Sequence, residues 1–445
     1  MCHYVIIGDG VAGTRAAETL RRRDQGARIT LLTEEAYPFY RRPLLPDYAA
    51  MLIPEARLWG KTPDFYRNSK LELHLGTRVT QVDPPGHRVR LAGGESLAYD
   101  RLLVATGRRF ETGAHRIPGA VAPNGFKTLD DARSVRSMVE AGALGGAGKT
   151  AAVYGNGLVA LAMLRALTRS GFATHYLVPT ETLWPEVLDK EAAAIATSRI
   201  RAAGATLELG ATVGAVDGAD VVGVCAGYVP SVDFLPDGGR GFQVDAGYRT
   251  PWEDVYAAGD VTAPSGRHYF NWLRSWRQGA TAGEVMAAPL PAHETPAAGP
   301  DVDILNMTLL GLSLVALGRT TVEYRSGYTE MRGDYPAGEF YKKLVFDPDG
   351  ILVGALLMGS IAEAGALEEA IRARVHKDRL APALVHQLFD LTYKTTYQGV
   401  QCPVCKHEIQ LGKNARPGDA VTCPVCGVDF VLEQGEHALR VRLAK

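Results

Sequence analysis

The sequence has almost no excess charge and no apolar run long enough to cross a membrane. Its 445 residues carry 48 Lys and Arg against 49 Asp and Glu, so the chain lacks the basic footprint of a protein that binds nucleic acid or an anionic membrane. The longest apolar segment, Ile304–Leu317, is short for a membrane span and contains Asn306 and Thr308. The segment after Met1 lacks the features of a signal peptide. We therefore expect a cytoplasmic protein of roughly two to four domains, without nucleic-acid partner or membrane insertion.

Cysteine is also scarce. Of the six present, Cys2 and Cys225 stand alone, and we expect them to be small buried apolar residues. The other four form two Cys-Pro-Val-Cys pairs near the C-terminus, which in a reducing compartment favour a metal site over disulfides.

What the sequence does contain is a glycine-rich opening. The apolar run Tyr4–Ile7 leads into Gly-x-Gly-x-x-Gly at Gly8, Gly10 and Gly13, followed by an Ala-rich stretch. This pattern predicts a strand, a tight turn and a helix N-terminus that together hold a pyrophosphate. A second apolar run ends before Glu34, about 20 residues further on, where such folds place an acidic residue against a ribose hydroxyl. The sequence therefore predicts a dinucleotide-binding unit, and a purely structural glycine turn is the alternative.

Two further stretches give the chain a family resemblance. Tyr99–Gly107 is typical of a buried parallel strand that ends in a small turn, and Val255–Val261 contains Ala-Gly-Asp ending at Asp260. Together with the opening motif they resemble the FAD-dependent pyridine nucleotide-disulphide oxidoreductases, particularly ferredoxin reductases, NADH oxidases and the flavin part of assimilatory nitrite reductases. The resemblance implies that Asp260 contacts the ribityl chain of FAD. It also implies an FAD site formed by Gly8, Gly10, Gly13, Glu34, Arg42, Val79, Ala105, Thr106, Gly107 and Asp260.

The same resemblance implies a flavin domain that is interrupted by a second domain. Thr150–Ala162 repeats the Rossmann-like start with Gly155 and Gly157, and Ala160 takes the place of the third glycine. We expect an α/β fold with two Rossmann-like dinucleotide-binding domains, the second inserted in the first, an α+β C-terminal interface domain and a small metal ribbon with four cysteines. The expected ranges are 1–112 and 236–290 for the FAD-binding domain, 113–235 for the NAD(P)-binding-like domain, 301–398 for the interface domain and 399–445 for the ribbon. In relatives the interface domain often mediates dimerisation, so a homodimer is a further expectation.

The chain departs from that family in ways that affect its chemistry. We expect the Pro-rich stretch Tyr37–Asp47 to be an irregular loop. Disulfide-active relatives carry a cysteine just after the first βαβ unit, and the corresponding loop here, Arg41–Pro46, has none, so the resemblance excludes a dithiol relay beside the flavin. Ferredoxin-reductase relatives carry a lysine in this loop that pairs with a glutamate of the second domain, whereas here Asp47 and Ala162 stand at those positions. At the end of the second strand of the inserted domain, Pro179 stands where a residue would bind the nicotinamide-nucleotide ribose, and Glu181 is the nearest acid.

The two cysteine pairs predict a tetrahedral four-sulfur metal site. The short strand-like stretches around them resemble small zinc ribbons of the amino-group carrier type, although the acidic tail of those proteins is missing. Zinc is therefore favoured, and a single rubredoxin-like iron is the alternative, because thiolate softness alone does not decide between them. A zinc clip would dock a partner, whereas an iron site would relay electrons. The expected ligands are Cys402, Cys405, Cys423 and Cys426.

These patterns lead to two functional hypotheses. The first is an FAD-dependent oxidoreductase without a redox-active disulfide, which exchanges electrons between NAD(P)H and a redox carrier or partner protein. The second is a flavoprotein electron-transfer subunit of a larger redox complex, with a degraded nicotinamide site at Gly155 and Gly157. The sequence identifies no catalytic residue.

Overall fold

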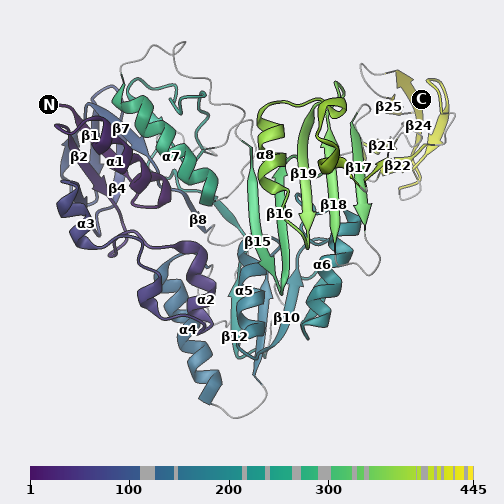
Figure 1. Cartoon of the computed structure of the whole chain (residues 1–445), viewed down its shortest axis with the longest axis horizontal. Helices are drawn as coiled ribbons and strands as arrows, with labels where there is room; N and C mark the ends of the chain where they lie inside the picture. Colours follow the sequence, from purple (N-terminus) through teal and green to yellow (C-terminus); the bar gives the residue numbers. More distant parts are fainter. Residues whose placement is uncertain are drawn as a thin grey trace. The chain divides into compact units, whose positions relative to one another are not determined.

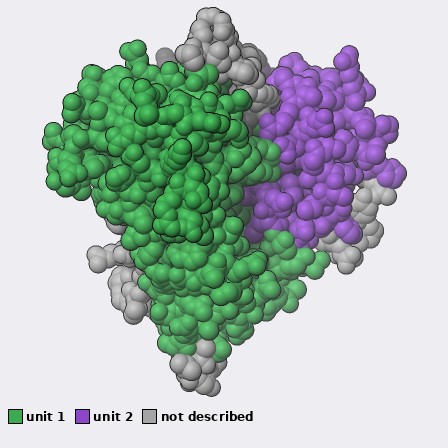
Figure 2. All heavy atoms as spheres, turned by 60° about the vertical axis from the view of Figure 1, so that its left-hand side comes forward, with its two compact units in different colours: residues 1–184, 193–304, 308–311 green, residues 185–192, 305–307, 312–445 purple. Residues whose placement is uncertain are grey.

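A computed structural model divides the chain into two compact units. Unit 1 comprises residues 1–184, 193–304 and 308–311, and unit 2 comprises residues 185–192, 305–307 and 312–445 (Figure 2). The residues that the structure describes are 1–110, 126–144, 149–212, 218–235, 241–262, 272–288, 302–322, 328–334, 340–386, 388–391, 399–404, 408–411, 415–423, 426–434 and 439–443. Among them, no helix combines the length and apolar character that a membrane crossing requires.

The first part of unit 1 is built on a parallel sheet of five strands (Figure 1). Its central strand is an apolar β-branched run in which Val5 and Ile6 belong to apolar clusters on opposite faces, as expected for a strand buried on both sides. The strand order is β14 (Val255–Ala257), β7 (Arg101–Val104), β1 (His3–Ile7), β2 (Arg28–Leu32) and β3 (Glu72–His74).

Two helices, α1 (Val11–Arg23) and α7 (Trp272–Ala287), pack side by side against this sheet (Figure 1). Their backbones can approach closely because Gly279 has no side chain. An added Cβ there would clash with the backbone of Ala12. Smaller elements complete this part. They are the antiparallel strands β4 (Val79–Asp83), β5 (Arg88–Leu91) and β6 (Ser96–Ala98), the pair β8 (Arg108–Phe110) and β13 (Tyr228–Pro230), and the short helices η1 (Arg42–Leu44), α2 (Leu45–Ala49), η2 (Glu55–Arg57) and α3 (Pro63–Asn68).

The second part of unit 1 repeats the parallel arrangement on a smaller scale. Its four-stranded sheet has the order β11 (Thr206–Leu209), β10 (Ala173–Val178), β9 (Thr150–Tyr154) and β12 (Val221–Val224). Helix α5 (Leu158–Arg169) follows β9 and packs on the sheet, as α1 follows β1 in the larger sheet. The remaining helices are α4 (Leu129–Leu144) and α6 (Lys190–Ala202).

Unit 2 is centred on a six-stranded sheet covered by α8 (Ala364–Arg372). The sheet order is β15 (Ile304–Leu309), β16 (Leu312–Gly318), β19 (Leu352–Met358), β18 (Tyr341–Phe346), β17 (Thr329–Asp334) and β20 (Phe389–Leu391), and the chain between β19 and β20 also contains the helices η6 (Lys377–Arg379) and α9 (Pro382–Val385). The segment 185–192 also belongs to this unit. Its Asp189 forms an ion pair with Lys343, which is fully buried, and the two charged groups are 2.5 Å apart. The burial of both groups makes this ion pair a fixed contact rather than a solvated one.

The C-terminal end of the chain forms a small ribbon with its own apolar core. Cys402, Cys423 and Phe430 are fully buried in it. Its strands are β21 (Gly399–Gln401) paired with β22 (Glu408–Gln410), and β23 (Ala420–Thr422), β24 (Asp429–Gln434) and β25 (Leu439–Leu443) in a second antiparallel sheet.

The expected fold class is confirmed by the two parallel Rossmann-like sheets, the mixed C-terminal part and the ribbon. Strand β14 returns to the first sheet beside β7 although the second sheet intervenes in the sequence. The four domain ranges stay a prediction, and their limits at 112, 290, 301 and 398 lie outside the described residues. The irregular loop expected over Tyr37–Asp47 is wrong in part, because η1 and α2 begin there with Pro43 and Pro46 in their first turns, where a missing N–H costs no hydrogen bond.

Candidate functional site

The first glycine turn, between β1 and α1, has an open space above the start of the helix. A side chain at Gly8, whose φ is +109°, would clash with the carbonyl oxygen of Ala105, and one at Gly13 would clash with that of Gly8. At Gly10, in contrast, an added Cβ would meet no atom within 4 Å. Among the described residues, no side chain caps α1 at its N-cap residue, Gly10. The turn therefore leaves backbone N–H groups and the positive end of the helix dipole facing a space suited to an anion.

Asp9, between the first two glycines, is a site residue that the motif did not reveal. Its side chain is 7% exposed and accepts hydrogen bonds from the Tyr66 hydroxyl (2.7 Å), the Thr14 hydroxyl (2.8 Å) and the Phe39 N–H (3.0 Å). Burial raises the pKa of Asp9 to about 6, although these three donors oppose the shift. Asp9 thus fastens the glycine turn to two segments that lie later in the chain.

Two acidic residues, Glu34 and Glu35, follow β2, and the side chain of Glu35 forms polar contacts with other residues of the protein. Glu34 is exposed, whereas Glu35 forms an ion pair with Arg42 and accepts a hydrogen bond of 2.5 Å from the Tyr40 hydroxyl. Arg42 also donates to the Tyr40 hydroxyl at 2.6 Å. Although burial raises the pKa of Glu35, the Arg42 guanidinium and the Tyr40 hydroxyl outweigh it, and the pKa lies below its usual value. The role predicted for Glu34 stays a prediction, and Glu35 lies beside it.

Asp260 is held from two elements. The Ser275 hydroxyl of α7 donates to its carboxylate at 3.1 Å, and Arg108 Nε of β8 lies 3.6 Å from the same group. The preceding residue is fixed as well, because the Gly259 N–H donates to the buried Gln278 side chain at 2.7 Å. The strand end therefore presents Asp260 in a defined direction.

Lys127, which the sequence did not single out, belongs to the same charged region. Its carbonyl oxygen accepts a hydrogen bond of 3.1 Å from Arg42. Burial lowers the pKa of its ammonium group to about 8, and the Arg42 and Arg108 charges act in the same direction, while Glu35 and Asp260 oppose them. This region (Glu35, Arg42, Arg108, Lys127, Asp260) brings together charges from four separate stretches of the chain, and we call it the charged cluster.

The other predicted FAD residues lie around the ends of the first sheet. Ala105, Thr106 and Gly107 follow β7, and the Thr106 hydroxyl donates to the Ser231 carbonyl at 2.6 Å. Val79 is 6% exposed and packs in the apolar cluster that includes the strands of this sheet. The described structure assigns no ligand to these residues, so their roles stay predictions.

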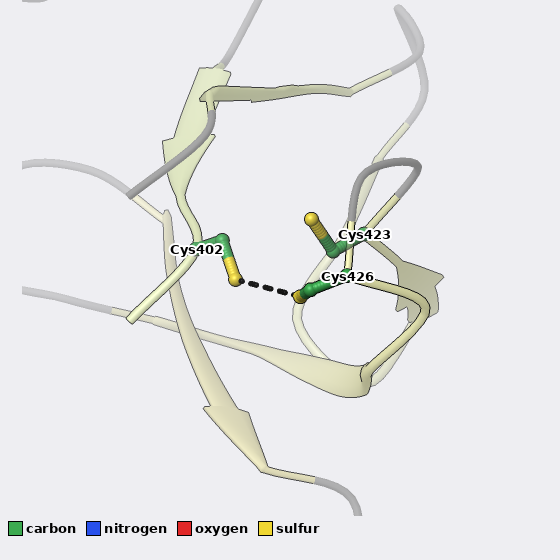
Figure 3. Close-up of side chains that lie close together, drawn as sticks. All are labelled: Cys402, Cys423 and Cys426. Carbon is green, nitrogen blue, oxygen red and sulfur yellow. Dashed lines mark hydrogen bonds between the residues drawn. The ribbon is translucent and has the colours of Figure 1, made fainter. Parts of the chain in front are cut away.

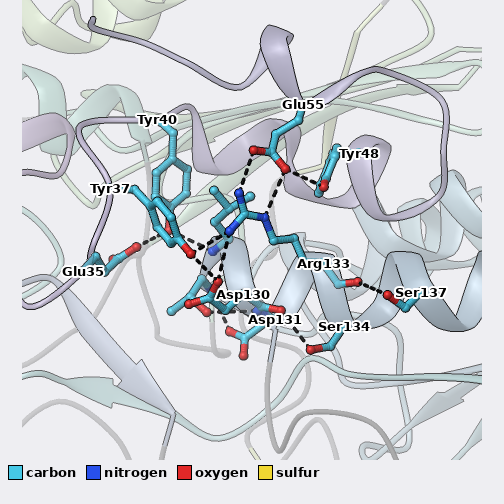
Figure 4. A network of polar contacts seen from close by, with 12 residues as sticks. Glu35, Tyr37, Tyr40, Tyr48, Glu55, Asp130, Asp131, Arg133, Ser134 and Ser137 are labelled. Carbon is cyan, nitrogen blue, oxygen red and sulfur yellow. Dashed lines mark hydrogen bonds and ion pairs between the residues drawn. The ribbon is translucent and has the colours of Figure 1, made fainter. Parts of the chain in front are cut away.

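A polar network anchors α4 to the segment that follows β2 (Figure 4). Arg133 forms an ion pair of 2.7 Å with Glu55 and donates to the Tyr37 hydroxyl at 2.6 Å. Glu55 accepts a further hydrogen bond of 2.7 Å from the Tyr48 hydroxyl of α2. The helix that leads to the second sheet is thereby fixed to the first part of the unit.

The second glycine turn, between β9 and α5, has the same backbone shape. A side chain at Gly155, whose φ is +145°, would lie 2.6 Å from the Cys225 carbonyl oxygen, whereas an added Cβ at Gly157 would meet no atom within 4 Å. Ala160 replaces the third glycine and is fully buried. In the described part of the chain, α5 also has no side-chain cap at its N-cap residue Gly157.

The polar groups of this second turn are neutral. The Asn156 amide donates to the Thr180 hydroxyl just after β10, and its oxygen accepts a hydrogen bond of 2.6 Å from the Trp184 N–H. The side chain of Glu181 lies against Gly210, which follows the neighbouring strand β11. Pro179, the position predicted to lack a ribose-binding acid, is thus followed directly by Thr180, which is hydrogen-bonded to an uncharged side chain.

Cys225 is the cysteine closest in sequence to this turn's sheet, since it follows β12 directly. It is 5% exposed, and burial raises the pKa of its thiol to about 12. Such a thiol is not a thiolate at neutral pH and does not act as a redox nucleophile.

Three cysteine sulfurs meet in the ribbon (Figure 3). The sulfurs of Cys402, Cys423 and Cys426 lie within 4.8 Å of one another, with 3.5 Å between those of Cys402 and Cys426. Sulfurs that share a tetrahedral metal with bonds of about 2.3 Å lie about 3.8 Å apart, so these three can share one ion. Cys405, the predicted fourth ligand, lies outside the described residues.

Known proteins match this chain over most of its length. Residues 2–283 match the family model described as pyridine nucleotide-disulphide oxidoreductase. The chain is 31% identical to the ferredoxin–NAD(+) reductase component of the anthranilate 1,2-dioxygenase system of Burkholderia cepacia, over 84% of this chain and 95% of that protein. It is 26% identical to subunit epsilon of the NADH-dependent phenylglyoxylate dehydrogenase of Aromatoleum evansii, over 83% and 91% respectively. The crystal structure of NADH:rubredoxin oxidoreductase from Clostridium acetobutylicum has the same fold, with a TM-score of 0.71 at 20% identity over 85% of this chain and 97% of that one.

Proposed function

The chain belongs to the pyridine nucleotide-disulphide oxidoreductase family, and from that membership we propose that it is an FAD-dependent oxidoreductase that passes electrons between NAD(P)H and a redox carrier protein. One observation carries the proposal. Unit 1 contains two glycine turns of the same shape, and the second glycine of each, Gly10 and Gly157, faces open space at a helix start. Two such turns suit two dinucleotides, one that stays bound and one that exchanges.

The residues around the first turn fit FAD. The space at Gly10 would take the pyrophosphate, and the charged cluster offers both cationic and anionic partners to a polar ligand. Asp260, held by Ser275, would orient the ribityl chain. FAD, when bound, supplies the capacity to accept a hydride and to release electrons singly. The protein's part is to bind it, to orient it and to exclude water.

The proposed transfer at the flavin uses no thiol of the stretch Tyr37–Asp47 and does not use that of Cys225. The stretch Tyr37–Asp47 contains no cysteine, and Cys225 is buried with a raised pKa. Electrons therefore pass directly between the flavin and its donor or acceptor, in contrast to the disulfide chemistry for which the family is named. Relatives named as ferredoxin–NAD(+) reductases point to a small redox protein as the partner.

An anaerobic titration of the purified protein tests this function. Bleaching of the flavin absorbance by NADH or NADPH supports it, and the two cofactors compared at equal concentration identify the preferred one. A protein that carries flavin but is bleached only by dithionite would lack a nicotinamide site.

That second outcome describes the alternative function, an electron-transfer subunit of a larger complex. The hydrogen bond between Asn156 and Thr180 favours it, because it places neutral groups where a ribose needs a specific polar partner. Subunit epsilon of the phenylglyoxylate dehydrogenase is a relative that works within such an assembly. Isolation of the native protein from its source, followed by gel filtration, distinguishes a complex from a single chain or a homodimer.

We also infer that the ribbon binds one zinc ion through Cys402, Cys405, Cys423 and Cys426. The burial of Cys402 and Cys423 and the small size of the ribbon support a structural role, in which the metal replaces part of a core. Metal analysis of the purified protein tests the identity of the ion. One zinc per chain, lost together with the ribbon's protection from proteolysis on chelation, is the expected result, whereas stoichiometric iron with a visible charge-transfer colour would make the ribbon an electron relay.

A further inference from the structure

A short helix connects the surroundings of the two glycine turns. Helix α2 follows η1, which begins at Arg42 of the charged cluster. From α2, the Asp47 carboxylate accepts a hydrogen bond of 2.7 Å from Arg165 of α5, the helix that begins at the second glycine turn. The side chains are 15% and 22% exposed, so the ion pair is largely removed from water.

The same two helices meet at a second point. The Ser170 hydroxyl, at the C-terminal end of α5, donates to the Ala50 carbonyl at the end of α2. On its other side α2 contacts α4, where Arg136 donates to the Tyr48 carbonyl at 2.9 Å and lies over the Tyr48 ring. Helix α2 is therefore fixed on both sides and cannot shift without breaking several polar contacts.

This contact connects the helix of the second turn with the segment that begins at Arg42, near the first turn. Arg165 lies eight residues along α5 from Gly157, which is about 12 Å at the helical rise, and Asp47 lies five residues after Arg42. A displacement of α5 would therefore act on α2 through the ion pair, and α2 directly follows η1, which begins at Arg42 of the charged cluster. Removing one partner would leave the other charge largely buried without its counterion, which strongly destabilises such contacts.

We propose that the Asp47–Arg165 ion pair is a positioning pair that sets the spacing between the flavin and nicotinamide sites. The proposal rests on the proposed function, because it assigns to this contact the alignment that hydride transfer between two bound dinucleotides requires. Such transfer needs reacting atoms about 3 to 3.5 Å apart, and a misplacement of about 1 Å costs up to about a hundredfold in rate. Neither side chain is assigned any contact with the reacting atoms.

The test uses the full-length protein and four variants. Asp47→Asn and Arg165→Met each remove the ion pair, and the double variant Asp47→Arg with Arg165→Asp restores it with reversed charges. Glu72→Gln is a control for the loss of an ion pair that does not connect the two turns, because the ion pair of 2.8 Å between Arg28 and Glu72 joins two strands of a single sheet. Two quantities are measured in each protein: amide hydrogen exchange of residues 45–49 and 158–169 without added nucleotide, and the single-turnover rate of flavin reduction at saturating NADH.

We expect both single variants to increase exchange in both helices and to slow flavin reduction by about ten- to a hundredfold, with flavin content and NADH affinity nearly unchanged. The reversed pair should recover both quantities, and Glu72→Gln should change neither. Unchanged exchange in the single variants would show that the pair fixes nothing and would overturn the proposal. Raised exchange with an unchanged rate would also overturn it, since the pair would then be merely structural.

A failure of the proposed function gives a different result. In that case the wild-type flavin is not reduced by NADH at all, while the exchange measurement still responds to the single variants. The positioning role then falls together with the nicotinamide site, and the contact between α2 and α5 remains.

Discussion

The two glycine turns of unit 1 share a backbone but differ in the groups that surround it. Gly8 and Gly155 both have positive φ and both lie against the carbonyl of a neighbouring strand end, and Gly10 and Gly157 both face open space. The residue between the glycines is the buried Asp9 in the first turn and Asn156 in the second. The shape that admits a diphosphate is therefore present twice.

The difference lies in charge. Beyond β2 the chain supplies the Glu35–Arg42 ion pair, whereas beyond β10 it supplies Pro179 and Thr180, the latter bonded to Asn156. Backbone N–H groups bind any diphosphate, but ribose and ring recognition depend on specific polar side chains. From this difference we propose that the first turn holds a resident cofactor and that the second turn holds its ligand loosely.

The largest expected effect comes from filling the open space in one turn at a time. Gly10→Val should give folded but flavin-free protein, because its Cβ meets no protein atom within 4 Å and its side chain would occupy the place proposed for the pyrophosphate. Gly157→Val is the matched variant in the second turn, and it should keep its flavin while losing reduction by NADH. Flavin absorbance per chain measures the first effect. Normal flavin content in Gly10→Val would mean that the cofactor lies elsewhere.

The second effect concerns the pH dependence of stability. It tests the difference between the first turn, where the residue between the glycines is the titratable Asp9, and the second turn, where it is Asn156. The pKa of Asp9 is raised from 3.8 to about 6 by folding, so the folded state binds this proton more tightly than the unfolded state does. Its contribution to stability is fully present below about pH 3.8 and is lost as the pH rises through about 6, and the loss amounts to about 3 kcal/mol.

Asp9→Asn should remove this component, since an amide does not titrate there and makes the first turn resemble the second. The measurement is the free energy of unfolding of the flavin-free protein by urea at several pH values between about 4 and 7. The difference between wild type and variant should fall across that window. Parallel pH profiles for the two proteins would show that Asp9 is not the titrating group.

The third effect is smaller and tests the anchoring of the first turn's ligand. Asp260→Ala removes the carboxylate held by Ser275 and Arg108, and flavin should bind roughly ten- to a hundredfold more weakly, as expected for the loss of a hydrogen bond to a charged group. Asp254→Ala serves as a control, because this acid pairs with Arg101 at 3.7 Å at the opposite end of strand β14. Equal flavin affinity in both variants would remove Asp260 from the site.

The sequence was sufficient for the fold of the two turns, because that information is local. Gly8, Gly10 and Gly13 stand between an apolar run and a helix, and the same spacing recurs at Gly155 and Gly157. The spacing of the glycines between a strand-like and a helix-like run can be recognised from neighbouring residues. The atoms that a side chain at Gly8 or Gly155 would meet, the carbonyls of Ala105 and Cys225, come from distant segments. The resemblance then supplied the return of β14 to the first sheet, which no local pattern reveals.

The side chains of the site were harder to predict, because they converge from distant segments. Lys127 follows a segment without any motif and reaches the charged cluster only through the tertiary fold. Asp9 lies inside the motif but occupies one of its variable positions, and its partner Tyr66 is far away in the sequence. In the sequence Asp47 differs from relatives at its position, but nothing there pairs it with Arg165, which lies about one helical turn beyond Ala162 in the structure. Contacts between residues that are far apart in the sequence follow no regular spacing, so no sequence pattern predicts them.

The smallest expected effect comes from a substitution that makes the second turn chemically more similar to the first. Pro179→Glu places a carboxylate directly after β10, where it can accept hydrogen bonds from a ribose, although it must compete with the bond between Asn156 and Thr180. One such hydrogen bond contributes about 1 kcal/mol, or about fivefold in affinity for NADH, and the gain should be absent in Pro179→Ala, which has no side-chain acceptor. The dissociation constant follows from the amplitude of flavin bleaching at increasing NADH concentrations. If wild-type protein already binds NADH at micromolar concentration and Glu181→Gln weakens that binding, then Glu181, two residues beyond Pro179, supplies the contact, and the second turn is a complete site built with a different acid.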